Sequence, residues 1–139
     1  MADEIPLIVV REGAALSLSL NNTNKKNALT SEMMGALTSI FENAKKYEDL
    51  RAIVIRGNGS TFCSGADINT WNPEELQKLL FSIADCPIPT IAHVHGICFG
   101  GGMGVASACD FVIAEKGTMF GFPEVKIGLI PAVISPYVS

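Results

Sequence analysis

The chain has 139 residues, 48% of them hydrophobic, and a net charge of −4. This length fits one domain, and we expect residues 1–139 to form a single domain around one core. The acidic balance argues against a nucleic-acid-binding surface, which needs a clustered basic face. The longest apolar runs are too short to span a membrane, and the acidic start lacks the features of a secretory signal. We therefore expect a cytoplasmic protein with no nucleic-acid or membrane partner.

The four cysteines are widely spaced, with no C-x-x-C pair and no histidine at a metal-ligand interval. This pattern predicts reduced cysteines that serve in packing, and no metal site.

In the first half of the chain, apolar residues alternate with serines in "ALSLSL", which predicts a half-buried hairpin together with the preceding "LIVV". Residues 21–27 are all polar and predict a loop. From Ser31 to about Tyr47 the apolar residues follow helical spacing, with Thr30 or Ser31 as the cap. The segment "RAIVIRG" predicts a strand that is buried on both faces.

In the second half, Asn72 and Pro73 followed by two glutamates predict the start of a helix, which Pro87 and Pro89 end. We then expect a strand in "TIAHVHG", a short buried helix in "GGMGVASAC", a strand in "FVIAE" and a short strand with a loop in "TMFGFPEVKIG". Alternating strands and helices predict an α/β fold with mostly parallel pairing. The final "GLIPAVISPYVS" is apolar, so we expect more chain or a partner to cover it.

Three adjacent glycines, Gly100 to Gly102, stand between a predicted strand and a predicted helix. Backbone N–H groups at such a helix start can bind negative charge, because no side chain blocks them. The lysine of a P-loop is missing, and no convincing dinucleotide fingerprint is present. A purely structural alternative is that the glycines let the helix pack closely on the sheet.

A second loop, "FCSGAD", also follows a buried strand and places Ser64 and Gly65 where ligands bind in parallel sheets. If both loops face one pocket, two N–H donors can stabilise the enolate oxygen of a thioester. Glu124 is the candidate base, because apolar neighbours in "FGFPEVKIG" would raise its pKa. The alternative is an ordinary exposed loop glutamate.

The segments "NKKNALTSEMMGAL", "FCSGADI", "HGICFGGGMGVASACDFVIA" and "FGFPEVKIGLIPA" resemble, in order and spacing, the enoyl-CoA hydratase/isomerase (crotonase) family. The resemblance covers nearly the whole chain. It implies a crotonase-like spiral of strand–strand–helix units. The family's C-terminal helical region, which helps to form trimers or hexamers, is missing from the sequence. The longer protein is then expected to be a homotrimer or hexamer.

The resemblance also implies site residues. Ser64 and Gly101 would donate the two oxyanion N–H groups, and Glu124 would move the proton. Ser64 to Asp67 would line the acyl-CoA, with Ala66 meeting the adenine through its backbone. The remaining substrate-binding residues implied by the resemblance are Lys26, Ala28, Leu29, Gly65, Ile68, Gly100 and Gly104. Coenzyme A enters as part of the substrate, and no separate cofactor is expected.

Gly104 departs from the family pattern, since many hydratases carry a second catalytic glutamate at this place. With glycine at this place and with its closing segment, the chain resembles methylglutaconyl-CoA hydratases. This resemblance implies a branched or carboxylated acyl group. The expected reaction is hydration of a 2-enoyl-CoA through one glutamate. The alternatives are an enoyl-CoA isomerase, or a catalytically inactive, truncated member that only binds.

Ser64 could form a nucleophilic triad with His93 or His95 and with Asp67 or Asp110, but no nucleophile-elbow pattern is present. Both histidines are expected to be structural, with His95 near the pocket entrance. Trp71 is either part of a mobile lid over the acyl chain or part of a packed loop.

Overall fold

The computed structural model describes residues 5–67, 69–70 and 72–121. The chain forms a five-stranded sheet in the order β1-β2-β3-β4-β6 and a two-stranded sheet, β5-β7. The strands of the larger sheet are β1 (Leu7–Glu12), β2 (Ala15–Leu20), β3 (Ala52–Gly57), β4 (Thr90–Val94) and β6 (Phe111–Ala114). The smaller sheet consists of β5 (Ile97–Phe99) and β7 (Met119–Gly121).

The predicted hairpin is confirmed: β1 and β2 pair antiparallel, with Val9 opposite Leu18. The leucines of β2 are buried and the intervening residues are half-buried, as the alternation predicts. From β2 onwards the pairing is parallel, through β3 and β4 to β6. The predicted α/β class with mostly parallel strands is therefore confirmed.

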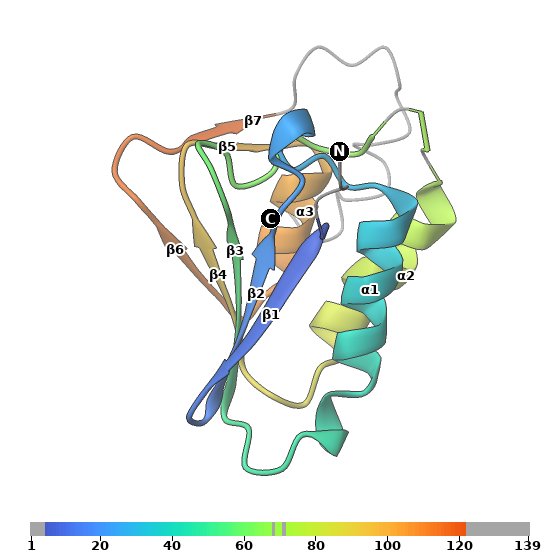
Figure 1. Ribbon diagram of the computed structural model, residues 1–139, viewed down its shortest axis with the longest axis vertical. Coiled ribbons are helices and arrows are strands. Elements are labelled where there is room, and N and C mark those ends of the chain that lie inside the picture. Colours follow the sequence, from blue (N-terminus) through green and yellow to red (C-terminus); the bar gives the residue numbers. More distant parts are fainter. Residues whose placement is uncertain (1–4, 68, 71, 122–139) are drawn as a thin grey trace.

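Strand β3 is buried on one face only, which corrects the prediction of burial on both. Ile53 and Ile55 are fully buried, whereas Ala52 and Val54 are half-buried. The reason lies in the layering, because helices α1 (Ser31–Glu42) and α2 (Pro73–Ala84) lie along the same side of the sheet (Figure 1).

Both long helices begin at the predicted caps. The hydroxyl of Thr30 accepts the N–H of Met33, and the side chain of Asn72 accepts the N–H groups of Glu74 and Glu75. Helix α1 ends at Glu42, earlier than predicted, and the 3-10 helix Ala44–Lys46 follows it. The core lies between the helices and the sheet. Its largest fully buried side chains are Phe41, Phe62, Leu16, Leu18, Leu20, Leu29, Met33, Met34, Leu37, Ile53, Ile55 and Leu76.

The smaller sheet gives the fold its repeat. Strand β5 follows β4 directly and leads into α3 (Gly101–Ala108), and β7 follows β6 in the same way. One turn earlier, Cys63 forms an isolated parallel bridge with Cys98 of β5. Each unit thus pairs a strand of the larger sheet with a segment in or beside the smaller sheet, and the units of β3 and β4 then run into a helix. This is the expected spiral of strand–strand–helix units.

Apolar side chains are exposed where the two sheets end. All four residues of β6 are exposed, and so are Met119 and Phe120 of β7. The apolar segment 128–139, which we expected to be covered, lies outside the described residues.

The described residues contain neither a disulfide nor a cluster of potential metal ligands. Three of the four cysteines are buried, as expected for packing residues, and Cys86 is partly buried. Within the described part of the chain, no helix is long and apolar enough to cross a membrane.

Candidate active site

The loop around Ser64 and Gly65 lies against the start of α3. A Cβ atom added to Gly101 would stand 3.6 Å from the backbone nitrogen of Ala66, and one added to Gly65 would stand 3.9 Å from that of Gly101. The structure thus brings together the two glycine-bearing loops that the sequence singled out.

Residues 26–29 run beside the Ser64 loop and accept two of its N–H groups. Ser64 donates its N–H to the carbonyl of Lys26 at 3.1 Å, and Asp67 donates to Leu29 at 3.0 Å. Leu29 in turn donates to the carbonyl of Gly65 at 2.7 Å. The Ser64 N–H is therefore engaged within the protein. Its predicted role as an oxyanion donor stays a prediction.

Ala66 differs from Ser64 in its pairing. It pairs with Leu29 in a parallel bridge, in which the N–H groups of successive residues point to opposite sides. Among the described residues, none accepts a hydrogen bond from the Ala66 N–H or from the Gly101 N–H. Gly101 is the first residue of α3, where N–H groups have no partner within the helix. Two donors without an acceptor in the described part of the chain thus lie close together at the positive end of a helix dipole.

The adjacent glycines have different tasks. At Gly102 a Cβ atom would lie 2.8 Å from the Cβ atom of Cys63 and 2.9 Å from its carbonyl oxygen, so glycine is required for packing. At Gly101 it would meet a side-chain methyl of Leu29 at 3.2 Å, beside the free donors. Close packing and an N–H group without an acceptor among the described residues thus both occur here.

Asp67 is held away from the two donors. Its carboxylate accepts the N–H of Asn69 at 3.0 Å and contacts the ammonium group of Lys25 at 3.1 Å. The Asn69 N–H lowers the pKa of Asp67 most, and the hydrogen bond and charge of Lys25 lower it further. The charged Asp67 therefore ties the Ser64 loop to the segment that contains Lys25.

The structure also places the residues implied for coenzyme A binding. Lys26 is exposed, Ala28 is half-buried and Leu29 is fully buried. Gly104 is buried within the first turns of α3, where its N–H donates to the carbonyl of Gly100. The candidate base Glu124, together with Ile68, lies outside the described residues.

One residue that the sequence reasoning missed stands out beside these loops. Asn27 is completely buried, and its side chain bonds to the main chain of Asn22, Asn58 and Thr61. The signal in the sequence was an asparagine at the end of a polar loop. Asparagine at such a place can indicate a turn with left-handed backbone, because it tolerates this conformation.

The triad considered from the sequence is not assembled. The Ser64 hydroxyl donates to the carbonyl of Lys25, and Asp110 accepts the N–H of Thr90.

Both histidines have other partners. His93 contacts Glu115 at 3.2 Å, and His95 lies 2.7 Å from the carbonyl oxygen of Gly59. That both histidines are structural, with His95 near the pocket entrance, stays a prediction. Trp71, the residue considered for a lid, lies outside the described residues.

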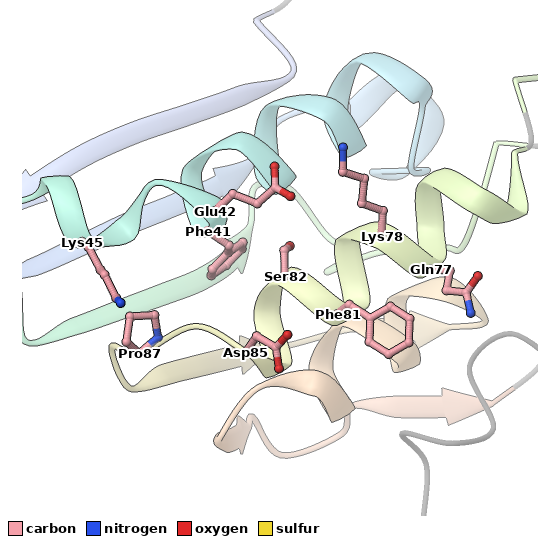
Figure 2. Close-up of a pocket in the computed structure, with 9 residues that line it drawn as sticks. All are labelled: Phe41, Glu42, Lys45, Gln77, Lys78, Phe81, Ser82, Asp85 and Pro87. Atoms are coloured by element: carbon pink, nitrogen blue, oxygen red, sulfur yellow. The ribbon is translucent and has the colours of Figure 1, made fainter.

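A groove of about 720 Å³ lies away from the two loops, between α1 and α2 (Figure 2). Its lining mixes charges of both signs, Lys45 and Lys78 with Glu42 and Asp85, around the rings of Phe41 and Phe81. No residue predicted for the site lines this groove, so it adds nothing to the argument for a thioester site.

Known proteins resemble this chain in both sequence and fold. It is 34% identical over 137 residues to the enoyl-CoA hydratase ACTT6 of Alternaria alternata, a match that covers 94% of this chain and 46% of the relative. The structure of an enoyl-CoA hydratase from Shewanella pealeana matches with a TM-score of 0.87 and 33% identity, over 96% of this chain and 56% of that one. Pseudomonas aeruginosa AtuE matches with a TM-score of 0.88 and 29% identity, over 96% and 57%.

The chain spans about half the length of the curated relatives it matches. The family model "Enoyl-CoA hydratase/isomerase" matches residues 11–138. With its spiral of strand–strand–helix units and its two facing loops, the chain belongs to the enoyl-CoA hydratase/isomerase (crotonase) family.

Proposed function

We propose that this chain holds the thioester carbonyl of a 2-enoyl-CoA while water adds across the double bond. The observation that carries the proposal is the pair of neighbouring N–H groups, of Ala66 and Gly101, that have no acceptor among residues 5–67, 69–70 and 72–121. Two donors that converge at a helix N-terminus suit an oxygen that gains negative charge during the reaction. Membership of the family supports an acyl-CoA thioester as the substrate.

In the proposed reaction, water attacks C3 of the enoyl group and the π electrons move onto the thioester oxygen. The two N–H groups stabilise the resulting enolate, and each donor is worth about 2.7 to 4 kcal/mol at an oxyanion site. The enolate then collapses as C2 takes a proton. The donors need no rearrangement during the step, because the backbone already holds them.

Glu124 is the proposed proton-transfer residue. It would accept a proton from the attacking water and return one to C2, so that a single carboxylate serves both transfers. Gly104 stands where many family members carry a second glutamate. The absent side chain would leave room for a branched or carboxylated acyl group, as in methylglutaconyl-CoA.

Two alternatives remain distinct in chemistry. One carboxylate also suffices to move a proton between carbons, so Gly104 equally favours an enoyl-CoA isomerase. A member without turnover would bind the thioester and release it unchanged.

Product analysis separates these possibilities. The chain is incubated with 3-methylglutaconyl-CoA and with short 2- and 3-enoyl-CoAs, beside the Glu124→Gln variant, and the products are analysed by chromatography and mass spectrometry. The proposal expects a mass gain of one water that vanishes in the variant. A product of unchanged mass but different retention would establish the isomerase, and turnover unaffected by Glu124→Gln would exclude this mechanism.

A further inference from the structure

Asn27 is a buried polar residue with no part in the proposed chemistry. Its backbone is left-handed, with φ of 57°, and none of its surface is exposed. Residues of this kind are retained only when every polar atom has a partner. The partners of Asn27 therefore indicate what its burial achieves.

Both ends of the Asn27 side chain are fully used. Its Nδ2 donates to the carbonyl oxygens of Asn58, at 2.9 Å, and Thr61, at 2.8 Å. Its Oδ1 accepts the N–H of Asn22 at 2.8 Å. Two carbonyl partners on one end and an N–H on the other fix the orientation of the amide. The side chain thus ties the loop after β2 to the loop after β3.

The neighbours of Asn27 in the chain are the residues that orient the Ser64 loop. Lys26, directly before it, accepts the Ser64 N–H, and Leu29 exchanges hydrogen bonds with Gly65 and Asp67. The carbonyl of Gly65 and the N–H of Asp67 face Leu29. The N–H of Ala66, which lies between these two residues in the chain, therefore faces the opposite side, toward Gly101. A shift of residues 26–29 by one position would change which N–H groups of the Ser64 loop they accept.

We propose that Asn27 is a positioning residue that holds residues 26–29 in register and so aims the Ala66 N–H at the thioester oxygen. It does not contact Ala66 and acts through Lys26 and Leu29. This inference rests on the proposed function. Asparagine suits the position because it tolerates left-handed backbone and carries two donors beside an acceptor. Aspartate has the same shape but lacks both donors.

The test uses the Asn27→Gly variant, because glycine adopts the same backbone angle without a side chain. The probe is 4-dimethylaminocinnamoyl-CoA, a thioester whose absorption moves to longer wavelength when its carbonyl oxygen accepts hydrogen bonds. The matched control is Asn58→Ala, which removes the bond from Asn58 to the side chain of Asn21 but keeps the carbonyl that Asn27 uses. Spectra are taken at saturating protein, so that weaker binding alone does not change them.

We expect the wild type and Asn58→Ala to give the full red shift, and Asn27→Gly to bind the probe with most of the shift lost. A full shift in Asn27→Gly, or an equal loss in both variants, would overturn the inference. If Asn27→Gly does not fold, as judged by circular dichroism, Asn27→Asp is measured in the same way.

Hydrogen exchange separates this inference from the proposed function. Without ligand, Asn27→Gly should speed the exchange of the Leu29, Ser64 and Asp67 amides while leaving that of Ile55 in β3 unchanged. Unchanged exchange at all of these amides would overturn the inference. A wild type that gives no red shift would overturn the proposed function, and the exchange result would then decide the role of Asn27 alone.

Discussion

The N–H groups of Ala66 and Gly101 lie close together, and among the described residues they lack an acceptor for different reasons. Gly101 is free because it begins a helix, so its donor depends only on local geometry. Ala66 is free because its neighbours are paired with residues 26–29, which lie far away in the sequence. One donor of the proposed site is thus positioned by residues next to it in the sequence, and the other by residues far from it. Different substitutions should therefore displace the two donors.

The largest effect is expected on the local side, from Gly102→Ala. The added methyl group would lie 2.8 Å from the Cβ atom of Cys63 and 2.9 Å from its carbonyl oxygen, so α3 must move away from the sheet. Overpacking of this kind costs about 1 to 3 kcal/mol, and urea unfolding measures it.

A matched control for this change is Gly35→Ala, which lies in α1 with no atom within 4 Å of the added group. It should stabilise the protein by about 0.5 to 1 kcal/mol, because alanine is the better helix former. Equal losses of stability in both variants would show that packing against Cys63 is not the cause.

Gly101→Ala should change the site more than the stability. The nearest obstacle is a side-chain methyl of Leu29 at 3.2 Å, which can move, so the change in unfolding free energy should stay within about 1 kcal/mol. The methyl group would still stand beside the Ala66 N–H and hinder the approach of a thioester. The red shift of the cinnamoyl probe should therefore fall, and a full red shift would contradict this placement of the site.

On the remote side, the smallest effect is expected from Asp67→Asn. The lowered pKa of Asp67 means that its charged form stabilises the fold above the ordinary carboxyl pKa of about 3.9, and that this contribution disappears as the pH falls through the lowered pKa. The ion pair includes the partly exposed Lys25, so we expect a loss of less than about 1 kcal/mol at pH 7. Urea unfolding from pH 7 to pH 3 should show a smaller loss of stability toward acid in the variant. If the unfolding free energies of the wild type and the variant fell equally from pH 7 to pH 3, this role of Asp67 would be refuted.

The sequence predicted those strands and helix ends that are determined by residues close together in the chain. The alternation around Leu18 and the cap at Asn72 identified a strand and a helix start. The end of α1 was missed because Ala44, buried in the next 3-10 helix, continues the apolar spacing. Strand β5 was missed because three residues carry too short a pattern.

The difference in pairing between Ser64 and Ala66 has a non-local reason. Both residues stand in the same loop and both carry an N–H group. Only the bridge between Leu29 and Ala66 decides which of the two points toward Gly101, and no spacing within "FCSGAD" encodes that register. The start of α3, whose geometry is local, was predicted correctly.

The most direct test of the account is a titration of ¹⁵N-labelled protein with butyryl-CoA, a saturated thioester that cannot be hydrated. Hydrogen bonding to the thioester oxygen should move the amide proton resonances of Ala66 and Gly101 downfield, while that of Ser64, bonded to Lys26, should stay in place. A downfield shift of the Ser64 amide without one at Ala66 would contradict the account, and so would saturable binding that leaves both proposed donors unmoved.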